Sequence, residues 1–213
     1  MGWDKQITKM TTADILLRYT LQVDDASDLS STEQLDLAQE VYDEIQDDRD
    51  WEWLKATATG ITSISVSYVA LPTDFKKLST NKYNKSVVFV GSDYAEYQVV
   101  PMSSRHDYRG MTGYCYIDIP NLRLVFIVQP TSVEAIEYDY IKRAADLTPS
   151  TSPLVTSSQF GNLIAYGMAR KFVNIEQQDK SGGKTTYQRE FETEYNRILS
   201  DFRLIDAEIK LSI

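Results

Sequence analysis

The spacing of apolar residues changes twice along this chain of 213 residues. Near both ends, apolar side chains recur every three or four positions, which is the spacing of one face of an α-helix. Between residues 55 and 145 they alternate with polar residues or form short runs, which is typical of β-strands. The sequence therefore predicts an α+β fold, in which the terminal helices form a helical bundle and a central antiparallel β-region is inserted between them.

Residues 1–54 are expected to hold two helices, each preceded by hydroxyl residues. Thr11 or Thr12 precedes the first helix, and Ser30-Ser31-Thr32-Glu33 precedes the second. Such side chains accept hydrogen bonds from the free amide groups of a first helical turn. The acidic residues of the second helix are expected to face solvent. Its predicted buried face consists of Leu35, Ala38, Tyr42 and Ile45.

The β-region, residues 55–145, is expected to form a sheet of about five or six strands. One strand is predicted from about Ala56 to Pro72, which ends it because proline has no N–H for a neighbouring strand. Tyr114–Ile119 and Leu122–Val128 are predicted to form a hairpin, and Val133–Ile141 is predicted to close the sheet.

The last third, residues 157–209, is predicted to form an antiparallel helical hairpin. Its first helix begins at Ser157 or Ser158, and the small residues Gly161, Ala165 and Ala169 are expected to allow close helix approach. The second helix has a heptad-like apolar seam, which is the most regular helical pattern in the chain. The seam consists of Phe191, Tyr195, Ile198, Phe202, Ile205 and Ile209.

The charge and hydropathy of the chain exclude several classes of function. The formal net charge is −9, and an acidic chain repels DNA phosphates, so a sequence-reading DNA-binding protein is not expected. No apolar stretch reaches the length of a membrane span, and the first residues lack the basic and apolar regions of a signal peptide. We therefore expect a soluble protein that is made in a reducing cytoplasm.

No catalytic, cofactor-binding or metal-binding constellation is apparent in the sequence. Cys115 lies in an alternating stretch and is expected to be a half-buried strand residue, while His106 is the only histidine and is expected in a surface loop. Ser181-Gly182-Gly183-Lys184-Thr185 lacks the first glycine of a phosphate-binding loop, because Gln178 occupies that position. The protein is therefore predicted not to be an enzyme.

Several segments together resemble the head-to-tail adaptor, or connector, proteins of tailed bacteriophages. The resemblance lies in an N-terminal helical pair, a tryptophan-containing junction, a Thr/Ser-rich strand that ends in a Leu-Pro-x-Asp-Phe turn, and a C-terminal helical hairpin. The segments are Asp50-Trp51-Glu52-Trp53-Leu54, Thr57–Ser67, Tyr68-Val69-Ala70-Leu71-Pro72-Thr73-Asp74-Phe75, Tyr138-Asp139-Tyr140, the linker with Pro149 and Pro153, and Ser157–Ile209. Phe75 is expected to anchor the turn in the core, Asp74 to bond the turn backbone, and Trp51 and Trp53 to join the bundle to the β-region.

The resemblance implies a structural protein of the virion, located at the neck or portal vertex and made in the cytoplasm of a host bacterium. Such adaptors form a homo-oligomeric ring, commonly a dodecamer, between the portal protein and a tail or nozzle protein. The ring extends the channel through which double-stranded DNA passes without sequence-specific binding. On this basis the whole chain, residues 1–213, is expected to act as a single adaptor-like domain.

The C-terminal residues 204–213 are unusually apolar for the end of a chain and are expected to form a docking arm for the portal. The predicted partner-binding residues are Leu204, Ile205, Ile209, Leu211 and Ile213. Two alternatives remain open at this point. One is another ring subunit of the phage neck, tail or baseplate, and the other, less favoured, is an enzyme that uses carboxylates and a divalent metal.

Overall fold

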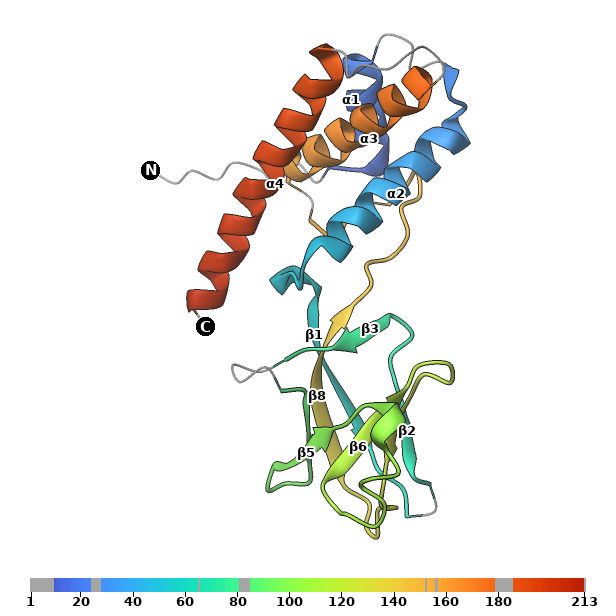
Figure 1. Cartoon of the computed structure of the whole chain (residues 1–213), viewed down its shortest axis with the longest axis vertical. Helices are drawn as coiled ribbons and strands as arrows, with labels where there is room; N and C mark the ends of the chain where they lie inside the picture. Colours follow the sequence, from blue (N-terminus) through green and yellow to red (C-terminus); the bar gives the residue numbers. More distant parts are fainter. Residues whose placement is uncertain are drawn as a thin grey trace. The chain divides into compact units, whose positions relative to one another are not determined.

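A computed structural model describes residues 10–23, 28–64, 66–80, 85–151, 153–155, 157–178 and 186–212. These residues form four α-helices and an eight-stranded sheet, so the mixed α+β class is confirmed (Figure 1). The chain divides into two compact units. The helical unit comprises Met1–Trp53 and Ala144–Ile213, and the β unit comprises Leu54–Arg143.

The helices begin at the capping residues that the sequence predicts. Thr11 and Ser30 each form a capping box, in which the hydroxyl accepts from the amide three residues on and that residue's carboxylate accepts from the cap amide. The Ser157 hydroxyl accepts from the Phe160 amide at the start of the third helix. The helices are α1 Thr12–Gln22, α2 Ser31–Asp48, α3 Ser158–Gln178 and α4 Thr186–Ser212.

Helix α3 contacts each of the other three helices through aromatic side chains. The Phe160 ring meets Tyr42 of α2 at 6.1 Å and Phe202 of α4 at 5.4 Å, both edge to face, and Phe172 meets Tyr19 of α1 at 6.2 Å. Edge-to-face pairs at these distances stabilise a core beyond the area they bury. The predicted antiparallel pairing of α3 with α4 is confirmed, because Phe160 lies beside Phe202 while Tyr166 lies beside Phe191.

Two of the predicted helix faces are partly wrong. In α2, Leu35 is only half-buried, and the buried residues are Leu37, Ala38, Val41, Tyr42, Ile45 and Gln46. In α4 the seam holds as far as Phe202, but Ile205 and Ile209 are 46% and 41% exposed, while Asp206 is 1% exposed. Asp206 follows Phe202 by four positions and takes the seam position that Ile205 was expected to occupy, because its carboxylate has partners inside the unit.

The eight strands form one sheet in the order β1-β8-β4-β5-β6-β7-β2, and β3 also pairs with β8. The predicted hairpin and the closing strand are confirmed as β6 with β7 and as β8. The strands are β1 Lys55–Ile61, β2 Tyr68–Ala70, β3 Phe75–Leu78, β4 Val87–Val90, β5 Ala95–Val99, β6 Tyr114–Asp118, β7 Arg123–Phe126 and β8 Ala135–Lys142.

Three predictions for the β-region are corrected. The described part of the β unit has eight strands instead of five or six. One pair, β5 with β6, is parallel, so the sheet is not wholly antiparallel. The single strand predicted from Ala56 to Pro72 is two strands that pair with different neighbours. The chain reverses after Thr62, whose hydroxyl donates to the Ser132 carbonyl and accepts from the Glu134 amide. A Ser63–Val66 bridge closes the turn.

The sheet curls so that its two ends approach each other. A Cβ atom added at Gly60 of β1 would lie 2.9 Å from the side chain of Val69 of β2. The interior is apolar and includes Phe75, which is 6% exposed, as predicted. The prediction for Asp74 is corrected: its carboxylate accepts from the Tyr140 hydroxyl at 3.0 Å instead of bonding the turn backbone, and the turn is closed by the Phe75 amide on the Pro72 carbonyl.

Candidate interaction surfaces

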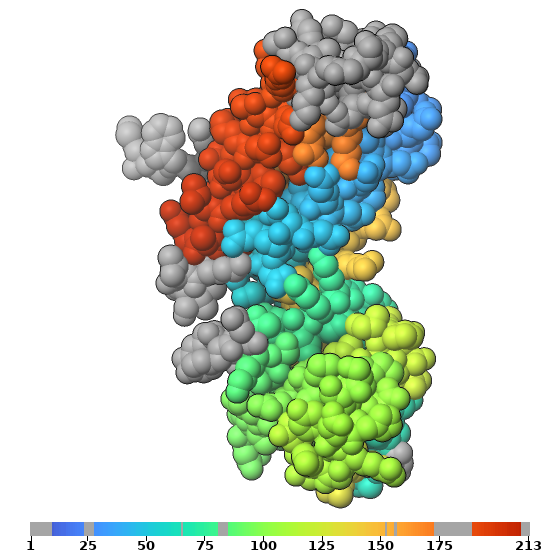
Figure 2. All heavy atoms as spheres, viewed as in Figure 1, coloured from blue at the N-terminus to red at the C-terminus, as the bar shows by residue number. Residues whose placement is uncertain are grey.

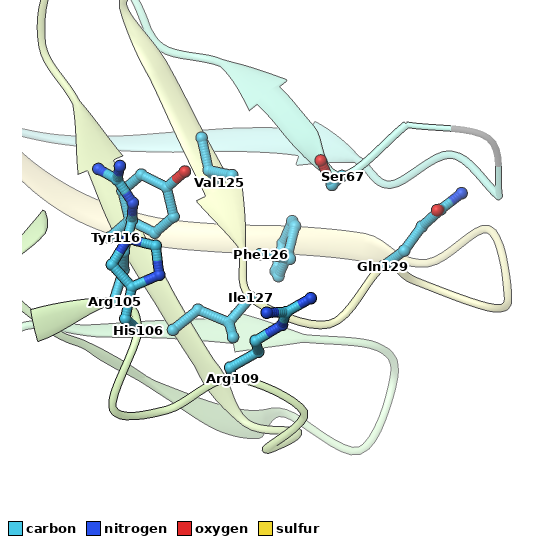
Figure 3. Close-up of a pocket in the computed structure, with 9 residues that line it drawn as sticks. All are labelled: Ser67, Arg105, His106, Arg109, Tyr116, Val125, Phe126, Ile127 and Gln129. Atoms are coloured by element: carbon cyan, nitrogen blue, oxygen red, sulfur yellow. The ribbon is translucent and has the colours of Figure 1, made fainter.

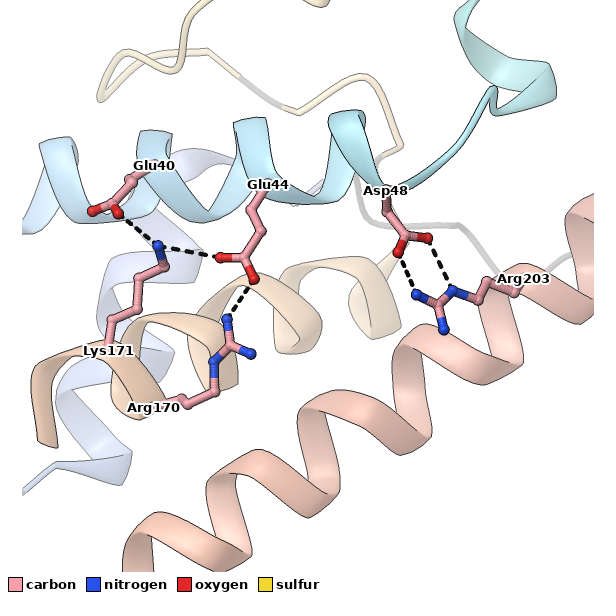
Figure 4. Close-up of polar contacts among 6 residues, drawn as sticks. All are labelled: Glu40, Glu44, Asp48, Arg170, Lys171 and Arg203. Atoms are coloured by element: carbon pink, nitrogen blue, oxygen red, sulfur yellow. Dashed lines mark hydrogen bonds and ion pairs between the residues drawn. The ribbon is translucent and has the colours of Figure 1, made fainter. Parts of the chain in front are cut away.

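Acidic side chains of α2 join this helix to α3. The helix carries seven acidic residues and no basic one. Glu40 contacts Lys171 at 2.6 Å, and Glu44 contacts Arg170 at 2.7 Å and Lys171 at 3.2 Å (Figure 4). Burial raises the pKa of Glu44, but the two cations outweigh burial and leave this pKa lowered. Part of the predicted solvent-facing acidic surface is therefore engaged within the helical unit.

A second group of charges joins α2 and its following residues to α4. The Arg203 guanidinium binds both carboxylate oxygens of Asp48, with its Nε at 2.9 Å (Figure 4). The buried Asp206 carboxylate accepts from the Glu52 amide at 2.7 Å and pairs with Arg49 at 3.3 Å. Charge-assisted bonds to a buried carboxylate are among the stronger polar contacts in proteins. Asp206 therefore fixes the final part of α4 within the helical unit.

The two tryptophans of the junction pack inside the helical unit. Their rings stack at 4.2 Å, and Trp53 also lies edge to face with Phe160 and Phe202. The Trp51 indole N–H donates to the Ile45 carbonyl at 2.6 Å. This places both rings in the aromatic core of the helices, and their predicted role in joining the bundle to the β-region stays a prediction.

The last turns of α4 present apolar side chains to solvent. Leu204 is 65% exposed, and Ile205 and Ile209 are 46% and 41% exposed. In the space-filling view, α4 forms a continuous surface of the helical unit (Figure 2). Of the other two predicted partner-binding residues, the side chain of Leu211 and the whole of Ile213 lie outside the described residues. The three described residues form what we call the α4 apolar surface.

The β unit has an open hollow of about 600 Å³. Val125, Phe126 and Ile127 line it from one side, and two arginines and the histidine line it from a turn that follows the short helix Met102–Ser104 (Figure 3). We call this hollow the basic pocket. Its lining residues are Ser67, Arg105, His106, Arg109, Tyr116, Val125, Phe126, Ile127 and Gln129.

The basic pocket was missed from the sequence, although His106 was correctly expected in a surface loop. The Arg105 guanidinium lies 5.9 Å from the centre of the Tyr116 ring, which is a cation–π distance. Tyr116 and Phe126 come from β6 and β7, and only the fold brings these strands to the turn that carries Arg105 and Arg109. The spacing of two arginines four positions apart was the only available signal.

Two observations bear on the enzymatic alternative: the state of the cysteine, and the placement of possible metal ligands among the described residues. Cys115 is fully buried, and burial raises the pKa of its thiol to about 12, so it lacks the thiolate that a nucleophile needs. Within the described ranges, no three His, Cys, Asp or Glu residues are placed to hold a metal ion. None of the helices described is both long and apolar enough to cross a membrane. Ser181–Thr185, which resembles part of a phosphate-binding loop, lies outside the described residues.

Comparison with known proteins indicates that these surfaces belong to a structural protein. A model of the SU10 adaptor protein family matches residues 10–208, a range that includes the whole β unit and nearly all of the described helices. A search of curated proteins found no significant match. Because the family model matches far more than half of the chain, this protein belongs to the SU10 adaptor protein family, a family of phage adaptor proteins.

Proposed function

We propose that this protein forms a ring between the portal and the tail of a phage particle, where it extends the DNA channel and docks the next tail component. The observation that carries the proposal is the family match over residues 10–208, which spans both units. On this view the protein is a virion component at the neck, and its partners are the portal protein, a tail or nozzle protein and further copies of itself in a closed ring. The resemblance to phage adaptors implies a dodecamer.

The α4 apolar surface is the proposed portal-docking site. Leu204, Ile205 and Ile209 are exposed although large apolar side chains are usually buried, and clustered exposed apolar residues mark protein interaction sites. Leu211 and Ile213 extend the same apolar character to the end of the chain. A helix that presents such residues binds a partner by laying its apolar face into a groove. The proposed docking arm, residues 204–213, would bind in this way.

The channel role is compatible with the charge of the chain. A net charge of −9 gives no general attraction for DNA phosphates, so DNA can pass without being held. Sequence-specific contacts are not part of the proposal.

The test is to mix the purified protein with portal rings and to follow assembly by light scattering and negative-stain electron microscopy. We expect a symmetric collar on the portal. If the protein ignores portal rings but binds tail or baseplate parts, it is another ring subunit of the neck, tail or baseplate, and the portal role is wrong.

The docking arm is tested by deleting residues 207–213. This truncation keeps Asp206 and its contacts with Arg49 and the Glu52 amide, so the helical unit should stay folded. We expect portal binding to be lost while the circular dichroism spectrum keeps its helical signal. Binding of the truncated protein with unchanged affinity would rule out these residues as the docking arm.

A matched pair of variants separates a specific apolar contact from general surface hydrophobicity. Leu204→Ser removes an exposed apolar side chain from the α4 surface, while Leu21→Ser removes one from α1 that is 78% exposed. We expect the first to weaken portal binding and the second to leave it unchanged. Equal effects of the two substitutions would contradict a role for α4 in docking.

A further inference from the structure

The net charge of the chain is unevenly divided between the two units. The helical unit contains 12 basic and 23 acidic residues, a net charge of −11, whereas the β unit contains 10 basic and 8 acidic residues, a net charge of +2. A surface of one sign favours contact with a surface of the other sign and disfavours contact with its own kind. The two units therefore carry complementary charge, although the chain as a whole is strongly acidic.

The positive charge of the β unit includes arginines without an acidic partner. Within the described part of the chain, neither Arg105 nor Arg109 forms an ion pair, and the interaction found for Arg105 is with the Tyr116 ring. In the helical unit, by contrast, Arg49, Arg170 and Arg203 each contact a carboxylate. The basic pocket thus presents guanidinium groups whose donors are available to a ligand from outside the chain.

The chemistry of the basic pocket suits carboxylates on a protein surface. A guanidinium group binds a carboxylate through two parallel hydrogen bonds, and Arg105 is half-buried beside an aromatic ring, which restricts its orientation. Val125, Phe126 and Ile127 add an apolar wall, which a protein segment can cover and a phosphate backbone cannot. The acidic charge of the whole chain also disfavours a nucleic acid as the ligand.

We propose that the basic pocket binds the acidic helix α2 of a second copy of this chain. Helix α2 has seven acidic residues and no basic one. Three of them pair with cations of the helical unit, whereas Asp36 is exposed and engages no cation in the described residues. Two unlike surfaces allow a heterologous contact that joins copies head to tail, which is the geometry that a closed ring needs. The inference rests on the proposed ring, and it names the surfaces that close it.

The test uses an Arg109→Lys variant and a carbodiimide, which joins an amine to a carboxylate in direct contact. Isotope-labelled and unlabelled full-length protein are mixed before cross-linking, so that mass spectrometry distinguishes links between copies from links within one copy. We expect a link between copies from position 109 to a peptide of α2. Links that occur only within a copy, or that reach no residue of α2, would overturn the proposal.

Control variants show whether the pocket itself is required. Arg143→Lys places the same amine at another exposed arginine of the β unit, outside the pocket, and should give no link to α2. Adding Arg105→Glu to the Arg109→Lys variant should lower the yield of the α2 link about tenfold, because a like charge then opposes the contact. An unchanged yield would contradict the proposal.

Three further outcomes separate this inference from DNA binding and from the proposed function. If a short DNA duplex binds the wild type and Arg109→Glu abolishes that binding, the pocket takes nucleic acid and the proposal is wrong. If the α2 link forms but no collar assembles on the portal, the self-association stands and the proposed function fails. A collar without the α2 link leaves the proposed function standing and removes this inference.

Discussion

The helical unit and the β unit hold their positive charges in different ways. In the helical unit, Arg170, Lys171 and Arg203 cross from one helix to carboxylates of α2, so their charge stabilises the fold. In the β unit, the Arg123 guanidinium lies 4.0 Å from the centre of the Tyr68 ring, and Arg109 has no ion-pair partner among the described residues. The comparison indicates that Arg170, Lys171 and Arg203 serve packing within the helical unit, whereas Arg105 and Arg109 of the basic pocket are available to a partner.

The cores of the two units also differ, which allows each to be followed separately. Phe160 is the centre of an aromatic group in the helical unit, whereas strand residues such as Phe126 fill the curled sheet of the β unit. All three tryptophans lie in residues 1–53, and nine of the fourteen tyrosines lie in the β unit. Tryptophan fluorescence therefore reports on the helical unit alone.

The largest expected effect comes from Phe160→Ala, which should destabilise the helical unit by about 3–5 kcal/mol. Phe160 is 1% exposed and contacts Tyr42, Trp53 and Phe202, so its removal leaves a cavity that these rings cannot easily fill. Urea unfolding followed by tryptophan fluorescence measures the loss.

The matched variant in the β unit is Phe126→Ala, a buried phenylalanine that is 3% exposed. It should move the unfolding transition seen in the near-ultraviolet circular dichroism of tyrosine to a lower urea concentration. The transition seen by tryptophan fluorescence should stay in place. A single transition that moves equally in both variants would show that the two units unfold together, and would break the comparison between them.

Asp206→Ala is expected to have the next largest effect, about 1–3 kcal/mol, because it removes the carboxylate that accepts from the Glu52 amide and pairs with the Arg49 guanidinium. Tryptophan fluorescence during urea unfolding measures it. The control is Asp201→Ala, which removes an exposed carboxylate that pairs with Arg197 on the same helix. Exposed pairs contribute about 0.2–1 kcal/mol, so similar losses in both variants would contradict a special role for the buried carboxylate.

Gly167→Ala tests how closely the helices approach α3. An added methyl group would lie 2.4 Å from the Val41 side chain of α2 and 3.1 Å from the Tyr195 ring of α4, so a neighbouring side chain or its helix has to shift. We expect the free energy of unfolding to fall by about 1–3 kcal/mol, although alanine by itself has a higher helix propensity than glycine. Adding Val41→Ala should make the double variant more stable than the sum of the single losses predicts. If the stability losses of the two single variants simply add, the clash is relieved somewhere other than at Val41.

The sequence predicted the starts of α1 and α2 and the β6–β7 hairpin well because these depend on neighbouring residues. Thr11 and Ser30 cap helices by contacts three residues along the chain, and the β6–β7 hairpin is closed by a short turn. The partners of the strands depend on residues far apart, so the separation of β1 from β2 and the parallel pairing of β5 with β6 were not predicted.

The candidate surfaces show the same limit. The exposed apolar residues of α4 were singled out as unusual for a chain end, but Ile205 and Ile209 were also counted in the buried seam. The seam continues at Asp206 because Arg49 and the Glu52 amide, more than 150 residues away, are its partners. From sequence alone, a polar residue is assigned to the surface unless such distant partners are known. The basic pocket was missed because it also depends on residues that are far apart in the sequence.

The smallest expected effect concerns pH and sharpens the comparison of charge use. The pKa of Glu44 is lowered from 4.5 in the folded chain, since Arg170 and Lys171 outweigh its burial. Its contribution to stability is therefore present above pH 4.5 and is lost as the pH falls through the folded pKa. Glu44→Gln should reduce the stability of the helical unit at pH 7 by about 0.2–1 kcal/mol and should make that stability less dependent on pH in the acidic range.

Urea unfolding followed by tryptophan fluorescence at pH 7 and at pH 3.5 or so measures this difference. Glu190→Gln is the control, because Glu190 is an exposed carboxylate on α4 of the same helical unit and forms no ion pair with these cations among the described residues. If Glu44→Gln and Glu190→Gln change the pH dependence equally, the pairs between α2 and α3 add nothing beyond general charge. A larger change for Glu44→Gln means that the helical unit uses these charges for its own packing, in contrast to Arg105 and Arg109 of the β unit.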